Sequence, residues 1–467
     1  MSSIKPVKNY KEFDWANPVI TSHYGADPFA MVYKDRVYIY ATADKYEYDE
    51  KGEIKENTYS KIKSLYCIST DDFANFEDHG EIVVACDAAA KWAHNSWAPA
   101  ACWKNIDGKD KFFLYFADNG GGIGVLSADS PVGPFTDPIG EGLITRKTPT
   151  CDTVEWLFDP AVIVDDDGNG YIYFGGGVPF GKAADPGTAR VCKLSDDMVH
   201  LAETPVPINP PYLFEDSGIH KFNNKYYYTY CTNFSVDAEG GKKWGIENGE
   251  ISMMVSDNPM GPFVFKEKIL ENPEKKFSVG GNNHHCVFCF KGQWYMTYHA
   301  RALEKLQGVM HGYRSTHIDE FDIAEDGTIG IIKQNYKGRK QIKNVDAFSL
   351  NSAVMTAQME GCYPVPSDEV SKKAGYGIMA LSDFVEGGFI EIQGVDFKEG
   401  ATEVELSMLV NNGMKVCVCV DSFDNEVAFF DTADTLKAKL TSAVSGVHNL
   451  FFVFGEGDCV IKGWKFI

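Results

Sequence analysis

The sequence lacks long apolar runs and any excess of positive charge. No stretch of about 18 apolar residues occurs, so no helix is expected to span a membrane. The chain carries 44 Lys and Arg against 66 Asp and Glu, which gives a net charge of −22 at pH 7. Phosphate backbones and anionic membrane surfaces would repel such a chain. We therefore expect neither a nucleic-acid partner nor a membrane partner.

The signals of a secreted, disulfide-stabilised protein are also missing. The start of the chain, Met1 to Lys8, has no apolar signal-peptide core. The 12 cysteines have the spacing of neither a zinc site nor a disulfide framework. Most of them lie in strand-like segments such as residues 416–420, where we predict small buried apolar side chains. These features predict a cytoplasmic location.

Long segments with helical periodicity are missing too, whereas aromatic residues are plentiful. Aromatic residues make up 13% of the chain, with 23 Tyr and 31 Phe. Aromatic and β-branched side chains fit the pleated, half-buried surface of a β-sheet. The composition therefore favours an all-β fold.

One segment shows the repeating design of the chain. It begins at Asp159, continues as an apolar strand to residue 164, turns at residues 165–170 and ends in the aromatic strand 171–174. The glycine-rich and acidic turn supplies the backbone angles that a β-hairpin needs. Asp165 to Asp167 are predicted to be a solvated turn and not a metal site.

The same design occurs four more times. The other predicted hairpins span residues 27–42, 97–116, 215–230 and 284–299. Further strand-like segments with their own turns follow these hairpins. A four-strand unit that recurs at intervals of about 45 to 70 residues predicts a five-bladed β-propeller.

In a propeller the first strand of each blade lines the central channel, so the five strand starts meet at one mouth. Here these starts hold Asp27, Trp97, Asp159, Glu215 and the pair His284-His285. A single carboxylate at a strand end is usually solvated or caps a turn. Three carboxylates at matching positions favour chemistry, and glycoside hydrolysis needs two carboxyl groups with different pKa values.

The other residues at the mouth each have two interpretations. Trp97 either stacks on a sugar ring or packs within its blade. Arg314, after the fifth hairpin, either reaches substrate hydroxyl groups or forms a surface ion pair. The adjacent residues His284 and His285 point in two directions, so at most one faces the channel, where it would bind a cation or contact the sugar.

A polar and basic linker separates a second β-rich unit from the predicted propeller. The linker spans residues 333–351, and strand-like segments follow it up to residue 466. A unit of roughly 115 residues is typical of a β-sandwich. We predict a propeller in residues 1–340 and a β-sandwich in residues 341–467.

Residues of about 20 to 335 resemble glycoside hydrolase family 43, the five-bladed propellers that cleave arabinose and xylose linkages. The matching stretches are Gly25-Ala26-Asp27-Pro28, Trp97-Ala98-Pro99, Phe158-Asp159-Pro160-Ala161, Phe214 to Lys221, Gly281 to His285 and Tyr313-Arg314-Ser315-Thr316. The resemblance implies an inverting mechanism, with Asp27 as general base and Glu215 as general acid. It makes Asp159 the residue that modulates the pKa of the acid and orients the sugar. It also implies a calcium ion in the channel, held through waters and either His284 or His285.

The stretch from Phe214 to Lys221 is most similar to the branch that releases arabinofuranose from arabinoxylan. This similarity implies an exo-acting glycosidase that removes α-L-arabinofuranosyl groups from arabinoxylan or xylo-oligosaccharides, with β-D-xylosidase activity as an option. The alternatives are a plain β-xylosidase, an endo-arabinanase and a non-catalytic carbohydrate-binding protein. The presence of all three carboxylates argues against the last of these.

The tail resembles carbohydrate-binding module family 6 in residues 394–401, 420–422 and 445–454. Residues 356–360 resemble a segment that often binds a structural calcium ion. The tail differs from that family because no tryptophan follows Thr432 to clamp a sugar, and Lys462-Gly463 precedes Trp464 where an aspartate is usual. A module that only supports the propeller is therefore the alternative to a sugar-binding one.

Overall fold

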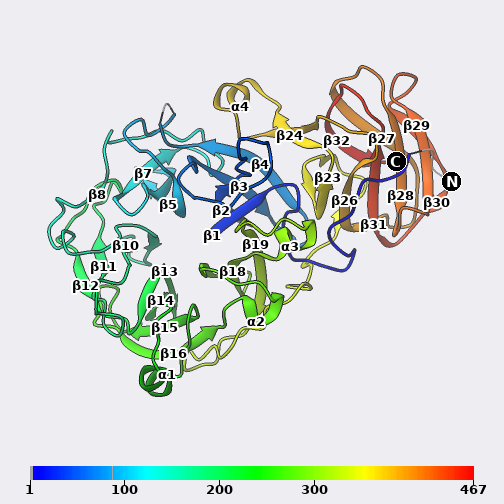
Figure 1. Cartoon of the computed structure of the whole chain (residues 1–467). Helices are drawn as coiled ribbons and strands as arrows, with labels where there is room; N and C mark the ends of the chain where they lie inside the picture. Colours follow the sequence, from blue (N-terminus) through cyan, green and yellow to red (C-terminus); the bar gives the residue numbers. More distant parts are fainter. Residues whose placement is uncertain (1–3, 87) are drawn as a thin grey trace. The chain divides into compact units, whose positions relative to one another are not determined.

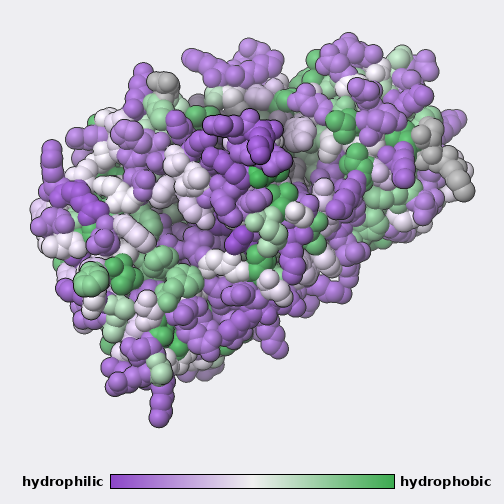
Figure 2. Space-filling model, in the orientation of Figure 1, coloured by the Kyte–Doolittle hydropathy of each residue, from purple (hydrophilic) through white to green (hydrophobic). Residues whose placement is uncertain are grey.

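The computed structural model describes residues 4–86 and 88–467, and β-strands dominate it (Figure 1). The helices of the described residues are short: α1 (Ala238–Trp244), α2 (Glu274–Phe277), α3 (Ala302–Gln307) and α4 (Glu369–Ala374). None of these described helices is long and apolar enough to cross a membrane. Hydrophilic side chains, purple in Figure 2, cover most of the face shown there. The prediction of an all-β fold is confirmed.

The chain divides into two compact units. The larger unit holds residues 24–66 and 81–338, and the smaller unit holds the chain up to His23, residues 67–80 and residues 339–467. The C-terminal part of the smaller unit therefore begins close to the predicted boundary after residue 340. The two N-terminal segments that belong to the same unit lie outside that prediction.

All five predicted hairpins are confirmed as antiparallel strand pairs. They are β1 (Tyr24–Tyr33) with β2 (Arg36–Asp44), β5 (Trp97–Ile106) with β6 (Lys109–Ala117), β9 (Ala161–Val164) with β10 (Gly170–Phe174), β13 (Leu213–Phe222) with β14 (Lys225–Thr232), and β17 (His285–Phe290) with β18 (Gln293–Ala300). Turn residues of the predicted kinds join the two strands of each pair.

Further strands extend the hairpins in chain order. These are β7 (Gly122–Ala128), β8 (Ile144–Thr145), β11 (Ala189–Lys193), β12 (Val206–Ile208), β15 (Ile251–Ser256), β16 (Val264–Leu270) and β19 (Ser315–Phe321). The resulting sheets run from β5 to β8, from β9 to β12, from β13 to β16 and from β17 to β19. β3 (Ser64–Thr70) and β4 (Phe76–Val83) follow β2, and the division into units falls within each of them.

The first strands of the five hairpins lie beside one another in a closed cycle. β1 contacts β5 and β17, β9 contacts β5 and β13, and β13 also contacts β17. Figure 1 shows the sheets of the larger unit, coloured from blue to green, around a common centre. The starts of these strands therefore come together, which a site at one mouth requires.

A one-residue β-bulge interrupts four of these strand starts. The strand pairing skips two residues between Ala26 and Phe29, between Trp97 and Ala100, and between Glu215 and Gly218. The same skip occurs before β9, where Phe158 accepts a hydrogen bond from Gly175 and Ala161 pairs with Tyr173. Bulges of this kind re-aim side chains and are common beside active sites.

The first skipped residue of each bulge has a positive φ angle. These angles are 49° at Asp27, 40° at Ala98, 48° at Asp159 and 69° at Asp216. Asp27 and Asp159 therefore occupy equivalent positions, whereas Glu215 lies one residue before its bulge. The residue equivalent to Asp27 in the fourth hairpin is Asp216, a distinction that the matching of motifs did not reveal.

The smaller unit contains two sheets around one apolar core. Its strands are β20 (Val345–Asp346), β21 (Asn351–Ser352), β22 (Met355–Thr356), β23 (Gln358–Glu360), β24 (Tyr363–Pro366), β25 (Met379–Ser382), β26 (Gly388–Asp396), β27 (Ala401–Val410), β28 (Lys415–Val420), β29 (Glu426–Asp431), β30 (Lys437–Val444), β31 (Val447–Phe454) and β32 (Val460–Phe466). One sheet has the order β20-β26-β31-β28-β29, and the other has the order β24-β25-β32-β27-β30. The shared core, which includes Phe452 and Trp464, gives the arrangement of a β-sandwich.

The N-terminal segment covers the outer face of one sandwich sheet. Ile4 belongs to an apolar cluster with residues of β26, β28 and β31, and Phe13 packs against it. The ring centroids of Phe13 and Phe451 are 4.9 Å apart. Lys11 is buried and donates a hydrogen bond from Nζ to the Ala357 carbonyl at 2.9 Å. These contacts explain why the described residues up to His23 group with the smaller unit.

Two smaller predictions have different outcomes. All cysteines except Cys86 and Cys289 are buried, and none of the 12, all within the described residues, forms a disulfide. The prediction of a solvated turn is wrong for Asp165, whose carboxylate binds Lys221 and Tyr226. This carboxylate reaches back to β13 and β14, a contact that a hairpin pattern does not encode.

Candidate active site

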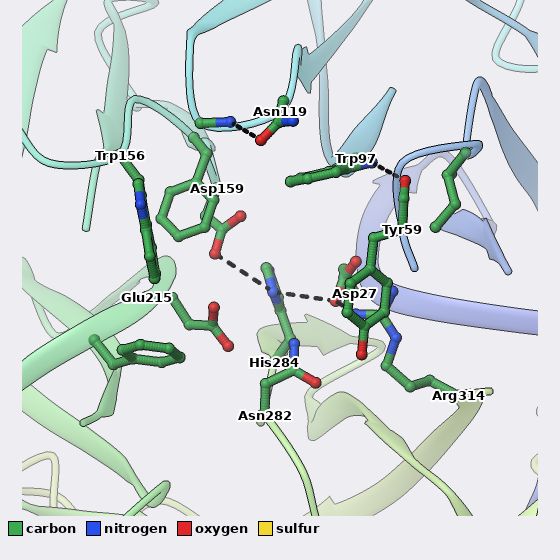
Figure 3. A pocket seen from close by; sticks show the side chains of 14 residues that line it. Asp27, Tyr59, Trp97, Asn119, Trp156, Asp159, Glu215, Asn282, His284 and Arg314 are labelled. Atoms are coloured by element: carbon green, nitrogen blue, oxygen red, sulfur yellow. Dashed lines mark hydrogen bonds and ion pairs between the residues drawn. The ribbon is translucent and has the colours of Figure 1, made fainter. Parts of the chain in front are cut away.

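A pocket of about 430 Å³ opens where the first strands of the larger unit begin (Figure 3). Its lining comes from all five hairpins or from the loops beside them. The lining residues are Asp27, Tyr59, Ile62, Trp97, Asn119, Gly120, Trp156, Phe158, Asp159, Phe214, Glu215, Asn282, His284 and Arg314.

The pocket brings together most of the residues that the sequence singled out. Asp27, Trp97, Asp159, Glu215, His284 and Arg314 all line it. His285 does not line it. Its Nδ1 contacts the Asp216 carboxylate and its Nε2 lies 2.7 Å from Thr229 Oγ1. The prediction that at most one of the two histidines faces the channel agrees with this arrangement, and the one at the pocket is His284.

Asp27 is buried and held in its ionised form. Thr42 Oγ1 donates to Oδ2 of Asp27 at 2.7 Å, and Arg314 Nη1 donates to Oδ1 at 2.9 Å. Burial by itself raises the pKa of Asp27, but Arg314, His284 and His299 outweigh it and hold that pKa well below its usual range. An ionised carboxylate in a pocket is able to accept a proton from water.

Glu215 has the opposite electrostatic environment. Burial raises its pKa most, and the negative charges of Asp159 and Asp27 raise it further, so the pKa of Glu215 lies well above its usual range. Its Oε1 is buried and has no hydrogen-bond partner among the described residues. A carboxyl group that is protonated and has an unpartnered oxygen is able to donate a proton to a ligand.

Asp159 and Glu215 titrate as a pair because they share one buried site. Burial and the charge of Asp27 also raise the pKa of Asp159. Asp159 nevertheless accepts a hydrogen bond from the backbone N–H of Asp216 at 2.9 Å, which favours its ionised form. When the two carboxyl groups hold one proton between them, we therefore assign that proton to Glu215, which receives no such bond.

Arg314 is buried at the pocket wall, so a surface ion pair is the wrong interpretation of this residue. Its Nε and Nη2 donate to the two oxygens of Asp44 at 2.9 Å each, and its Nη1 donates to Asp27. The Tyr59 ring lies with its centroid 4.8 Å from the guanidinium carbon. A guanidinium has five N–H donors, so two remain beyond the three that these carboxylates use.

His284 lies between carboxylates in Figure 3, where dashed lines join it to Asp27 and Asp159. Its Nδ1 is 3.4 Å from Asp27 Oδ1, and its Nε2 is 3.2 Å from Asp216 Oδ1. Burial lowers the pKa of His284, although the charges of Asp216 and Asp27 oppose this effect. Both ring nitrogens of His284 thus face carboxylate oxygens.

The described side chains around the pocket supply few ligands for the predicted calcium ion. Calcium takes about six to eight oxygen ligands. The described residues contain no group of three or more His, Cys, Asp or Glu side chains placed to hold a metal ion. The nitrogens of His284 and His285 already face protein oxygens. A calcium ion held by one of these histidines would therefore depend on water molecules for most of its ligands.

Several pocket residues were not singled out by the sequence. They are Tyr59, Ile62, Asn119, Gly120, Trp156, Phe158, Phe214 and Asn282. The Trp156 ring makes edge contacts with Phe158 and Phe214 at centroid distances of 5.3 and 5.4 Å. Phe158 and Phe214 each stand one residue before a predicted catalytic carboxylate, which is a signal that was available. Asn282 lies in the matching stretch Gly281 to His285 but was given no role, whereas Tyr59 lies in a loop and gave no such signal.

Taken together, the pocket has aromatic walls, two ionised carboxylates and one protonated carboxyl group. Aromatic faces and hydrogen-bonding side chains suit a neutral ligand with many hydroxyl groups. An acid and a base on the same pocket are able to transfer protons to and from such a ligand. The arrangement therefore supports general acid–base chemistry on a carbohydrate.

Comparison with known proteins agrees with this chemistry. Residues 15–329 match the family described as Glycosyl hydrolases family 43. The chain is 43% identical over 486 residues to an arabinoxylan arabinofuranohydrolase of Bacillus subtilis (strain 168), which covers 97% of this chain and 92% of that protein. It is 31% identical over 358 residues to Xylosidase/arabinosidase 43A of Humicola insolens, which covers 67% of this chain and 98% of that protein.

A solved structure is similar over the whole chain. It is the crystal structure of a glycoside hydrolase family 43 arabinoxylan arabinofuranohydrolase from Bacillus subtilis in complex with cellotetraose. The TM-score is 0.90 and the sequence identity 41%, with 98% of both chains covered. The family match spans most of the larger unit and includes all three pocket carboxylates. The chain therefore belongs to glycosyl hydrolases family 43.

Proposed function

We propose that the protein is an inverting exo-glycosidase that removes α-L-arabinofuranosyl groups from arabinoxylan or xylo-oligosaccharides. Membership of the family supports hydrolysis of a glycosidic bond, and the name of the Bacillus subtilis relative supports arabinoxylan as the substrate. One observation carries the proposal. The same pocket holds Asp27 ionised and keeps Glu215 protonated, with an unpartnered oxygen.

The roles of the three carboxylates follow from their environments. Glu215 protonates the glycosidic oxygen of the leaving group. Asp27 removes a proton from a water molecule that attacks the anomeric carbon from the opposite face, so the configuration inverts. Asp159 raises the pKa of Glu215 through its negative charge and orients the sugar. Trp97 and Arg314 contact the substrate from the pocket wall.

We also propose that the five sheets of the larger unit are the blades of a β-propeller. The closed cycle of first strands supports this arrangement. In this assignment, the larger unit, residues 24–66 and 81–338, is the catalytic domain, and the pocket is the mouth of the propeller. The cytoplasmic location stays a prediction.

A calcium ion in the channel also stays a prediction of the family resemblance, and no step of the mechanism passes through it. An ion held by His284 would have to share that ring with Asp27 or Asp216. The test is thermal unfolding of the chelator-treated protein with and without added calcium. A calcium-dependent rise in the unfolding temperature that is lost in His284→Ala would support the ion.

The role of the smaller unit is a separate proposal. We infer that residues 341–467 are a module of the carbohydrate-binding family 6 type that has little affinity for sugars. Its pocket of about 450 Å³ has no aromatic lining residue, and Ala433 stands there directly after Thr432. The N-terminal segment covers the outer face of the same sheet, whose strands β28 and β29 supply Lys415 and Asp431 to this pocket. The test compares the binding of arabinoxylan to Glu215→Ala with its binding to the same variant that also carries Ala433→Trp. Stronger binding by the double variant would agree with this inference.

The experiment that tests the main proposal is product release from arabinoxylan and from two chromogenic glycosides. These are p-nitrophenyl α-L-arabinofuranoside and p-nitrophenyl β-D-xylopyranoside, each given to the parent and to Glu215→Ala. We expect arabinose as the main product and, by NMR of the first product, β-arabinofuranose from the α-linked substrate. Release of the α-anomer would contradict inversion.

A β-xylosidase is the second candidate, and the name of the Humicola insolens relative favours it. Dominant release of xylose from xylobiose and from the xylopyranoside would select it over the arabinofuranosidase. An endo-arabinanase would instead shorten linear arabinan without releasing arabinose from either chromogenic substrate. No hydrolysis of any of these substrates would indicate a carbohydrate-binding protein.

A further inference from the structure

We propose that Asp44, a buried carboxylate behind the pocket wall, is a positioning residue that restricts Arg314 to a single hydrogen bond with Asp27. The inference rests on the proposed function because it concerns how the general base is kept available. Asp44 does not line the pocket, and neither the repeat pattern nor the family motifs singled it out.

The geometry shows two carboxylates that share one guanidinium. Asp44 is the last residue of β2 and is 1% exposed. Its Oδ2 accepts the backbone N–H of Arg314 at 3.1 Å and Nε at 2.9 Å, and its Oδ1 accepts Nη2 at 2.9 Å. Only Nη1 is directed to Asp27, at 2.9 Å from Oδ1.

The rest of the surroundings fix the same arginine. The Tyr59 ring packs over the guanidinium. The backbone before Arg314 is held by Glu304, whose Oε2 accepts the N–H groups of His311, Gly312 and Tyr313 at 2.8 to 2.9 Å. Glu304 therefore anchors the backbone before Arg314, and Asp44 anchors both the N–H and the Nε edge of Arg314 itself. The direction of Nη1 follows from these anchors.

This arrangement matters because a guanidinium tends to bind a carboxylate through two parallel hydrogen bonds. Asp44 occupies the edge formed by Nε and Nη2 and fixes the plane of the guanidinium. In that position only Nη1 donates to Asp27, which receives one bond from Arg314 instead of two. The other oxygen of Asp27 accepts a hydrogen bond from Thr42. With two bonds from Arg314, Asp27 would accept one more hydrogen bond. Hydrogen bonds to the charged form make a carboxylate a weaker base. Asp44 thus leaves Asp27 ionised and still able to take a proton.

The test is a double-mutant cycle between Asp44 and Arg314. Asp44→Asn keeps the shape of the side chain but removes its charge. We expect kcat on arabinoxylan to fall by roughly 10- to 100-fold, which is the order of effect of a small misplacement at a catalytic group. KM should stay within about threefold of the parent value, because Asp44 does not reach the substrate. In an Arg314→Ala background, Asp44→Asn should cause no further loss.

Asp319→Asn is the matched control, because Asp319 is also a buried aspartate and accepts a hydrogen bond from Tyr298 at 2.6 Å without lining the pocket. It should leave kcat near the parent value. Should Asp44→Asn fold poorly, Arg314→Lys is the second variant. Lysine keeps the positive charge but cannot span two carboxylates, so we expect a similar loss of kcat.

Two results would overturn the proposal. One is a parent-like kcat in folded Asp44→Asn. The other is an equal loss from Asp44→Asn in the presence and absence of Arg314, which would show that Asp44 acts independently. Failure of the proposed function is a different outcome, since the parent itself would then release no arabinose from arabinoxylan.

Discussion

The backbone N–H of Asp216 donates a hydrogen bond to Oδ2 of Asp159 at 2.9 Å. The bond links the peptide that follows Glu215 to the carboxylate beside it. Because it stabilises the charged form of Asp159, it also supports the high pKa of Glu215, which Asp159 raises through its negative charge. The backbone of the bulge in β13 therefore helps to keep Asp159 ionised and Glu215 protonated.

The first prediction concerns the alkaline limb of the pH profile. Activity requires protonated Glu215, so it falls as the pH rises through the pKa of that residue. Asp159→Asn removes a negative charge that raises this pKa, and the alkaline limb should therefore move to lower pH. The measurement is kcat/KM of parent and variant across the pH range. Asp319→Asn should leave the limb in place, and an unchanged limb in Asp159→Asn would refute the assigned role.

The second prediction concerns the leaving group. Glu215→Gln should lower kcat on arabinoxylan by roughly 10²- to 10⁴-fold, because the sugar leaving group needs a proton. The loss on p-nitrophenyl α-L-arabinofuranoside should be much smaller, since p-nitrophenolate leaves with little protonation. Steady-state rates on both substrates decide the matter, with circular dichroism as the check on folding. Equal losses on the two substrates would speak against Glu215 as the general acid.

The third prediction concerns Arg314 and the acid limb. Activity requires ionised Asp27, so it falls as the pH drops through the pKa of that residue. Arg314 lowers this pKa, and Arg314→Ala should therefore move the acid limb to higher pH. Arg314 also lowers the pKa of Glu215, so in Arg314→Ala the alkaline limb should move to higher pH as well. If the variant is slower at every pH but both limbs stay at the same pH, Arg314 acts on the substrate alone.

The fourth prediction concerns the stability of the smaller unit. Lys11 is 3% exposed and donates to the Ala357 carbonyl, with Glu391 and Glu360 nearby. Burial lowers its pKa to about 7, and burial raises the pKa of both glutamates to about 7. Lys11→Met should destabilise the unit by about 1–3 kcal/mol, because buried acceptors lose their partner. Urea unfolding provides the measurement.

Lys5→Met is the control for that experiment, because Lys5 comes from the same segment and is exposed. Its unfolding midpoint should match that of the parent. A Lys11→Met midpoint equal to that of Lys5→Met would mean that the N-terminal segment contributes little to the stability of the sandwich.

Much of the fold could be predicted from the order of residues. The five hairpins follow from local patterns, since alternating apolar residues and short turns of Gly, Asn and Asp specify strand pairs that are adjacent in the chain. Strand β30 has no such pattern, because its residues are mostly exposed and include two lysines and few large apolar side chains. The segment up to His23 escaped prediction, because a partner such as Ala357, which binds Lys11, lies 346 residues away.

The sequence by itself determined the all-β character, the five hairpins and the three carboxylates at strand starts, because each depends on neighbours along the chain. The tertiary structure decided what those carboxylates can do. It placed Asp27 and Asp44 against Arg314, and it left Glu215 Oε1 without a partner among the described residues. The physical reason is that burial and charge set a pKa, and both arise from residues that meet only when distant strands pack around one pocket.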